Sequence, residues 1–185
     1  MSMEYSRVIT GSNKQRSYSG DYMAIGKRAE TIIMDFLRRR PEVIGINDFR
    51  ELRAVQEADI DCAIKTADGR VTLAEIKSDY HLGKSGNVLF EVLRINHTAP
   101  TDHALTLGWS GRTPATYLLY YAPQVEKIYR CKTDDLRRAF QNYTKTVRKG
   151  MNISIVETDA IKTTINVLVP WEYCKDIFQV YSANA

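Results

Sequence analysis

The sequence is poor in the residues that build disulfide frameworks and zinc sites. Its 185 residues include only three cysteines and three histidines. Cys62, Cys131 and Cys174 lie far apart and form no CxxC pair, so their spacing fits no common metal-ligand pattern. We expect three reduced thiols in a cytoplasmic protein.

Long apolar runs are also absent. No segment approaches the roughly 20 apolar residues of a membrane-spanning helix, and we expect neither a signal peptide nor an anchor in the polar first segment. No GxxxxGK[ST] or GxGxxG motif occurs, so nucleotide binding of those types has no support. The apolar content of 44% and charged content of 26% are typical of a globular chain, and a net charge of +4 suits a polyanionic partner without requiring one.

The distribution of residue types predicts a mobile arm followed by one domain. Residues 1–20 are rich in serine, glycine and basic residues, including Arg7, Lys14 and Arg16, and predict a flexible basic arm. Residues 21–185 contain no linker and no internal repeat. They predict a single α/β domain.

Two amphipathic helices are predicted from spacing and capping residues. The first begins with Asp21 as its N-cap and ends before Pro41. The second covers residues 134–149, is capped by Thr133, and has a basic outer face that includes Arg137 and Arg138. Its predicted inward residues are Leu136, Phe140, Tyr143 and Val147. A brief helix is expected at the end of the chain.

Period-two apolar patterns predict the strands. They lie at residues 43–49, in a hairpin over 58–77, and at 87–95, 116–122, 126–131, 153–157 and 165–170. Residues 96–115 contain two prolines and two glycines and predict an irregular segment. The expected fold is therefore α/β, with one central mixed sheet flanked by helices.

The hairpin register decides which acidic residues meet. A two-residue turn would mix charged and apolar residues on both faces of the hairpin. A three-residue loop, 67–69, with a left-handed glycine at its end, instead separates them. That register places Asp61 opposite Glu75 and Asp59 opposite Lys77, all on one face. The sequence therefore predicts the three-residue loop.

This predicted face has the components for hydrolysis of a phosphodiester. Directly opposed residues have Cβ atoms about 4.5–5.5 Å apart, so the charges of Asp61 and Glu75 would repel unless a cation or proton intervened. Carboxylate oxygens suit a hard cation such as Mg²⁺ or Mn²⁺. Lys77 could orient a water molecule or stabilise charge on the phosphate.

These residues carry a resemblance to a known family. Asp61 followed by Glu75-Ile76-Lys77, with Glu30 in an upstream helix, resembles the PD-(D/E)xK nuclease superfamily, which includes restriction endonucleases, Holliday-junction resolvases and phage nucleases. The resemblance implies a restriction-endonuclease-like core in which Asp61 and Glu75 bind Mg²⁺ together with the backbone carbonyl of Ile76. It implies that Lys77 assists hydrolysis and that Glu30 completes the site through water.

The resemblance covers residues 24–95 and leaves one assignment open. No proline precedes Asp61, and the segment "ADID" offers Asp59 as an alternative metal ligand if the strand is bulged. Glu91, in "GNVLFEV", is a further possible metal ligand, because some phage-type members carry a similar Asn-x-x-x-Glu segment and a following Gly-Trp pair. Alternatively, Glu91 is a solvent-facing charge on an edge strand and has no role in a metal site.

Basic residues outside the motif are predicted to contact nucleic acid. The phosphate-binding candidates are Arg38, Arg39, Arg40, His81, Lys84, Arg137 and Arg138. For the arginine cluster, favourable charge at a helix C-terminus is an equal alternative. The expected partner is DNA, possibly branched, and a homodimer is expected because cutting two strands requires two active sites.

Three other interpretations remain open from the sequence. Glu75 and Lys77 could form an exposed salt bridge with little energetic value. The chain could be a non-catalytic nucleic-acid-binding or inhibitory protein on the same fold. It could also be a nuclease directed at RNA, since no residue here recognises or excludes a 2′-hydroxyl.

Overall fold

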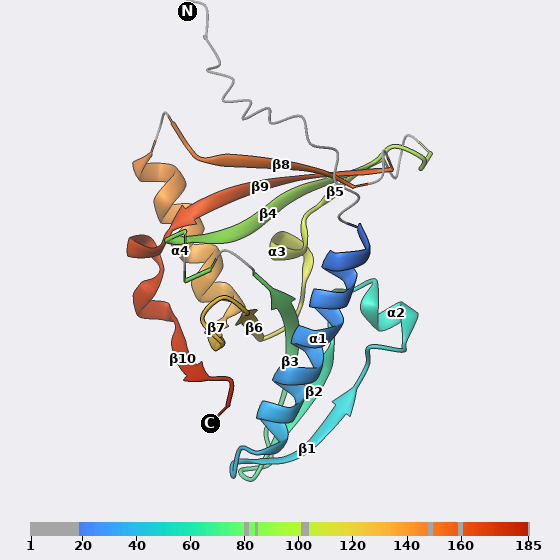
Figure 1. Ribbon diagram of the computed structural model, residues 1–185, viewed down its shortest axis with the longest axis vertical. Helices are drawn as coiled ribbons and strands as arrows, with labels where there is room; N and C mark the ends of the chain where they lie inside the picture. The colour runs from blue at the N-terminus through green and yellow to red at the C-terminus, as the bar shows by residue number, and fades with distance from the viewer. Residues whose placement is uncertain are drawn as a thin grey trace, which may run out of the picture.

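Two β-sheets form the framework of the protein in the computed structural model (Figure 1). It describes residues 19–79, 82–83, 85–100, 104–147, 150–158 and 161–184. The strands are β1 (Val43–Asp48), β2 (Cys62–Thr66), β3 (Val71–Ser78), β4 (Asn87–Asn96), β5 (Leu105–Leu107), β6 (Tyr117–Ala122), β7 (Lys127–Lys132), β8 (Ile153–Thr158), β9 (Lys162–Pro170) and β10 (Gln179–Ser182). The helices are α1 (Ser19–Arg38), α2 (Arg53–Gln56), α3 (Trp109–Arg112) and α4 (Thr133–Thr146), with 3₁₀ turns η1 (Trp171–Tyr173) and η2 (Lys175–Ile177).

The main sheet is mixed. Its strand order is β1-β2-β3-β6-β7-β10, with β3 and β6 parallel and the other neighbours antiparallel. This confirms the predicted α/β fold with a mixed sheet flanked by helices. The prediction of one sheet was incomplete, because β4, β5, β8 and β9 form a second, antiparallel sheet in the order β5-β4-β9-β8.

The main sheet has apolar side chains on both faces, each covered by a different layer. On one face α1 packs over a cluster that includes Ile33, Met34, Cys62, Ala74 and Ile76. On the other, α4 and the second sheet pack over a cluster that includes Val88, Phe90, Leu118, Tyr120, Leu136 and Val167. Successive residues of β3 and β6 therefore point into different layers.

The central hairpin has the predicted register. Cys62 pairs with Ala74, and the Thr66 N–H donates to the carbonyl of Arg70 at 2.9 Å, so the three residues 67–69 form the loop. Gly69 closes the loop with a φ of 82°, a backbone conformation that costs glycine little. The alternation of apolar and polar residues was sufficient to define this pairing.

The ends of the predicted helices need correction. Helix α1 begins at Ser19, inside the predicted arm, so Asp21 is not its N-cap; residues 1–18 lie outside the described part of the chain. Thr133 is the first residue of α4 instead of its cap, and its hydroxyl donates to the carbonyl of Ala115 at 2.5 Å. No side-chain capping hydrogen bond is found at α4.

Two predictions for irregular or terminal segments were also wrong. Residues 96–115 contain β5 and α3, both of which are short and lacked a periodic signal. The C-terminal helix is replaced by two 3₁₀ turns and β10, which extends the main sheet beside β7. Among the described residues, no helix is long and apolar enough to cross a membrane.

Candidate functional site

Glu75 and Lys77 point away from α1. Ala74 and Ile76, which alternate with them on β3, belong to the cluster under α1. Glu75 and Lys77 therefore face the opposite side of the main sheet, where the second sheet and α3 lie. Figure 1 shows α3 between the end of β3 and the second sheet.

Glu75 is a buried carboxyl group with one unpaired oxygen. Its side chain is 4% exposed. The ammonium group of Lys77 bonds its Oε1 atom, whereas its Oε2 atom has no hydrogen-bond partner among the described residues. Burial raises the pKa of Glu75 to about 8; the charge of Lys77 opposes this shift, and the charge of Asp61 adds to it.

Asp61 reaches β3 through its side chain. The strand ladder ends at the pair of Cys62 and Ala74, and the backbone N–H of Asp61 donates to the carbonyl of Ala74 at 3.0 Å. The Oδ2 atom of Asp61 then accepts the backbone N–H of Ile76 at 2.7 Å, and Oδ1 accepts Nε2 of Gln56 at 2.8 Å. These bonds fix the carboxylate beside the residue that follows Glu75.

Asp59 does not lie opposite Lys77, and this prediction was wrong. Its φ is 54°, so the chain turns at this residue before β2 begins. Its Oδ2 atom accepts Nε of Arg112 at 2.7 Å, and its carbonyl accepts the hydroxyl of Thr113 at 2.6 Å. Its carboxylate is therefore engaged by Arg112, and its role as an alternative metal ligand stays a prediction.

Glu30 lies on α1 near Asp61. Burial and the charge of Asp61 raise its pKa, and the charge of Arg50 lowers it. The guanidinium of Arg50 contacts Glu30 at 3.4 Å and forms two bonds to Asp48, of 2.8 and 2.5 Å. The structure thus places Glu30 within electrostatic range of Asp61, and a site shared with Glu75 and Lys77 stays a prediction for Glu30.

Glu91 is joined to α3. Its Oε1 atom accepts the backbone N–H of Trp109 at 3.3 Å and a guanidinium N–H of Arg94 at 2.9 Å. Its backbone carbonyl accepts the hydroxyl of Ser110 at 2.8 Å. Glu91 is 8% exposed, so the alternative of a solvent-facing charge was wrong, and a metal role stays untested.

The arginines near the end of α1 contact the protein itself. Arg38 is exposed and pairs with Asp35 at 2.8 Å. Arg39 donates to the carbonyl of Ala183 at 2.9 Å, and Arg40 pairs with Glu42 at 3.0 Å. Their contact with phosphate stays a prediction.

Arg137 was predicted to point outward from α4, and the structure corrects this. Its guanidinium donates to the carbonyls of Ser110 at 2.8 Å and Thr113 at 2.7 Å. Arg138 is exposed and pairs with Asp135. The predicted contacts of His81 and Lys84 lie outside the described residues.

The donor set fits a hard cation that is only partly held by protein. Asp61 and Glu75 supply carboxylate oxygens, and the unpaired Oε2 of Glu75 lacks the partner that a buried carboxyl group needs. Among the described residues, no cluster of three or more aspartate, glutamate, histidine or cysteine side chains could hold a metal ion. Mg²⁺ commonly takes one or two carboxylates and completes its shell with water and substrate phosphate, so two carboxylates are sufficient.

Four residues of this region were missed by sequence reasoning. They are Arg50, Gln56, Trp109 and Arg112, and each contacts a predicted site residue. Arg50 and Gln56 belong to a charged connection with no periodic pattern, and Arg112 to a segment predicted as irregular. The Gly-Trp pair was the sole signal for Trp109.

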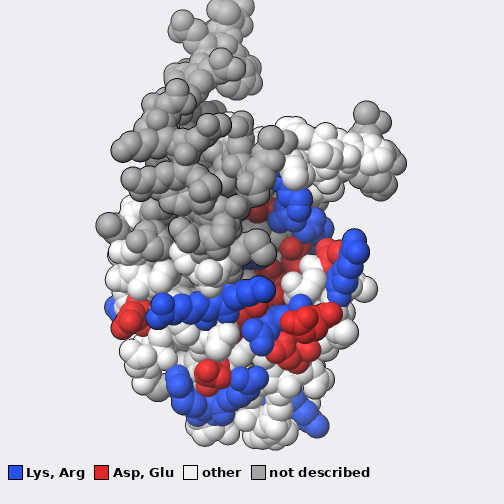
Figure 2. All heavy atoms as spheres, turned by 45° about the vertical axis from the view of Figure 1, so that its right-hand side comes forward, with Lys and Arg blue, Asp and Glu red and all other residues white. Residues whose placement is uncertain are grey.

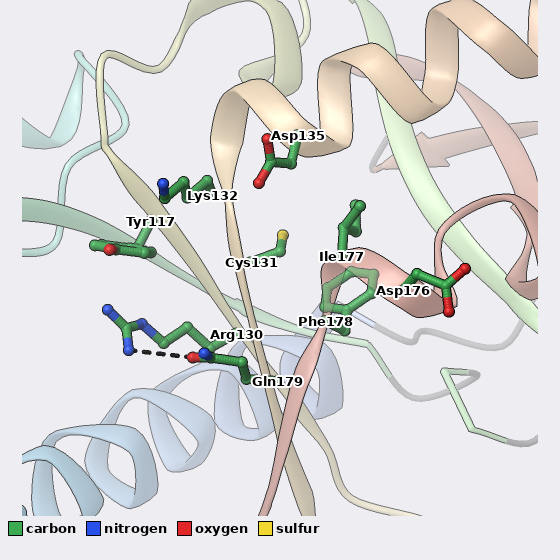
Figure 3. A pocket seen from close by; sticks show the side chains of 9 residues that line it. All are labelled: Tyr117, Arg130, Cys131, Lys132, Asp135, Asp176, Ile177, Phe178 and Gln179. Atoms are coloured by element: carbon green, nitrogen blue, oxygen red, sulfur yellow. Dashed lines mark hydrogen bonds between the residues drawn. The ribbon is translucent and has the colours of Figure 1, made fainter.

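Charged side chains of both signs gather on the face seen in Figure 2, where acidic side chains form a patch bordered by lysine and arginine. A hollow of about 220 Å³ lies elsewhere, near β7, η2 and the start of α4 (Figure 3). There Arg130 bonds Gln179 at 3.3 Å and lies 3.9 Å from the centroid of the Tyr117 ring. No predicted site residue lines this hollow.

Comparisons with known proteins are sparse. No model of a protein family matches the chain. No curated protein matches it. A search of solved structures finds the bacterial homing endonuclease I-Ssp6803I, with a TM-score of 0.44 and 16% identity over 74% of this chain and 79% of the other. At this TM-score the similarity is too distant to assign a family or an activity.

Proposed function

We propose that this protein is a Mg²⁺- or Mn²⁺-dependent endonuclease that hydrolyses DNA phosphodiester bonds at Asp61, Glu75 and Lys77. The observation that supports it best is the buried Glu75 carboxyl, which has one unpaired oxygen, bonds the ammonium of Lys77 and lies within electrostatic range of the Asp61 carboxylate. An exposed salt bridge would not bury an incompletely bonded carboxyl group, because its desolvation is costly.

Each residue has a separate part in the proposed reaction. Asp61 and Glu75 would bind the cation, with the Ile76 backbone carbonyl as a third ligand. The bound cation would neutralise phosphate charge and lower the pKa of water. Lys77 would orient the attacking water or stabilise charge on the phosphate, and Glu30 would hold a water molecule at the α1 side.

The proposed substrate is DNA, and the proposed active form is a homodimer. Arg38 and Arg138 are phosphate-contact candidates with exposed side chains, each paired with one aspartate on its own helix. Two copies would supply one active site for each strand of a duplex or branched substrate. The phosphate contacts predict a cleavage rate that falls with salt at low substrate concentration.

Plasmid cleavage tests the proposal. Supercoiled DNA, branched DNA and single-stranded RNA are incubated with the protein, with Mg²⁺ or with a chelator, alongside Lys77→Ala. We expect Mg²⁺-dependent cleavage of DNA and a loss of at least about 100-fold in Lys77→Ala, since a group that stabilises transition-state charge is commonly worth this much.

Lys65→Ala is the matched control, because Lys65 is an exposed lysine on the neighbouring strand β2. It should cleave as the unchanged protein does. Full activity of Lys77→Ala would contradict the proposed site. Cleavage of RNA alone would indicate an RNA nuclease. Metal-independent binding of nucleic acid without cleavage would indicate a non-catalytic nucleic-acid-binding protein.

A further inference from the structure

The indole ring of Trp109 lies against the ammonium group of Lys77. The Nζ atom of Lys77 is 5.3 Å from the ring centroid, within the distance of about 6 Å at which an aromatic face attracts a cation. Trp109 is 3% exposed and the Lys77 side chain 28% exposed, so water screens the attraction only in part. The same ammonium bonds Glu75. Lys77 is therefore held by two elements, a carboxylate on β3 and a ring on α3.

Trp109 is itself fixed to the second sheet by Glu91. The carboxylate of Glu91 accepts the backbone N–H of Trp109 at 3.3 Å, and the backbone carbonyl of Glu91 accepts the Ser110 hydroxyl at 2.8 Å. The N–H of Gly108 donates to the carbonyl of Val92 at 2.8 Å. These contacts coincide with the β-bulge in β4, where its pairing with β9 shifts after Glu91. The start of α3 therefore rests on this bulge.

The far end of α3 is also bound. Arg112 pairs with Asp59 at 2.7 Å. Arg137 of α4 donates to the carbonyls of Ser110 and Thr113. A helix of four residues has little stability of its own, so these contacts to β4, α4 and the segment before β2 determine where Trp109 lies.

We propose that Trp109 is a positioning residue for Lys77. We propose further that Glu91 acts on Lys77 indirectly, because its hydrogen bonds to Trp109 and Ser110 fix the position of Trp109. A lysine side chain has several rotatable bonds and loses rotamer entropy when its ammonium is fixed. The ring limits those rotamers and keeps Nζ beside Glu75. The consequence for catalysis rests on the proposed function of Lys77, whereas the placement of the ammonium group does not.

NMR of lysine-labelled protein tests the placement without any need for activity. Protons that lie over an aromatic face are shifted upfield, so the Hε resonances of Lys77, assigned with Lys77→Ala, should lie upfield of those of exposed lysines. Trp109→Leu should return them to the ordinary position. Trp109→Phe, which keeps a ring, should retain part of the shift, and Glu91→Ala should reduce it although neither contacting residue is changed.

Cleavage kinetics test the consequence. Trp109→Leu should lower kcat about tenfold, the effect expected for one desolvated cation–π contact, with KM and the Mg²⁺ dependence unchanged. Trp109→Phe should recover most of the rate. Thermal melting shows which variants are folded, and Trp109→Phe and Glu91→Ala give the same NMR test if Trp109→Leu does not fold.

The outcomes separate this proposal from the proposed function. A Lys77 Hε resonance at the ordinary position, or one unchanged by Trp109→Leu, overturns the placement. An Hε shift that Glu91→Ala leaves unchanged overturns the part assigned to Glu91. Wild-type kcat in Trp109→Leu overturns positioning, although the protein would still be a nuclease. A wild-type protein that cuts no nucleic acid overturns the proposed function, and NMR then decides the placement by itself.

Discussion

At the scale of single residues, the distinguishing group is the Glu75 carboxyl. It is buried beside one positive and one negative side chain, and one of its oxygens is unpaired. Such a group resists ionisation in the absence of a second cation. The sequence predicted two crowded carboxylates, and the structure adds that Asp61 and Glu75 are both buried.

The pKa of Glu75 predicts how the stability of the metal-free protein depends on pH. The folded value of about 8 exceeds the ordinary value of 4.5. Between these values the folded state retains a proton that the unfolded state has lost, so the free energy of unfolding falls as pH rises through this range. Below about pH 4.5 the contribution of Glu75 to the free energy of unfolding is fully present. Urea unfolding with a chelator at about pH 5 and about pH 8 measures the fall.

Glu75→Gln is the control for this dependence, because glutamine does not titrate. The fall in unfolding free energy between the two pH values should be smaller in this variant than in the unchanged protein. An equal fall in both would show that other groups are responsible.

Asp61→Asn tests whether this residue binds the cation. One side-chain oxygen remains to accept the Ile76 N–H, so the variant should fold. Mg²⁺ at about 100 times its dissociation constant should stabilise the unchanged protein by about 2.7 kcal/mol and Asp61→Asn much less. Asp35→Asn, at an exposed acid on α1, should respond like the unchanged protein. Equal Mg²⁺ stabilisation of Asp61→Asn would remove Asp61 from the ligand set.

At the scale of elements, α3 depends on close contact with β4. A Cβ atom at Gly108 would lie 2.1 Å from the carbonyl oxygen of Glu91, which leaves no room for a side chain. Gly108→Ala should therefore destabilise the protein by about 1–3 kcal/mol and displace α3. Gly111→Ala is the matched control, because its nearest contact would be an ordinary 3.8 Å. Chemical denaturation compares them; equal stabilities would contradict the close contact.

The central hairpin depends on the left-handed conformation of Gly69. No atom would lie within 4 Å of an added Cβ, so Gly69→Ala tests backbone conformation alone. It should cost about 1 kcal/mol of unfolding free energy. Gly26→Ala, in open space within α1, should instead stabilise by up to about 1 kcal/mol. Thermal melting measures both; a neutral Gly69→Ala would argue against the positive φ.

At the scale of the whole molecule, the proposed homodimer can be measured directly. Sedimentation equilibrium should give the mass of two chains, and plasmid cleavage should yield linear DNA along with nicked circles. A monomer that produces only nicked circles would contradict the proposed dimer while leaving the proposed single-strand chemistry intact.

Much of the architecture followed from local patterns. Helix α1, most strands and the hairpin register could be predicted because apolar periodicity determines which face each segment buries. The second sheet, α3 and β10 could not. Their elements are short or pair with partners far along the chain, as β4 pairs with β9 and β10 with β7, and local propensity carries no information about such pairing.

The sequence by itself determined the chemistry that is available: an aspartate, a glutamate and a lysine spaced so that a three-residue loop brings them toward one end of a hairpin. The tertiary structure alone decided their surroundings. It turned Asp59 toward Arg112, attached Asp61 to the Ile76 N–H, buried Glu75 and placed Trp109 over Lys77. Burial and cross-element contact arise from packing between segments distant in the sequence, and packing sets both the pKa of a carboxyl group and the position of an ammonium group.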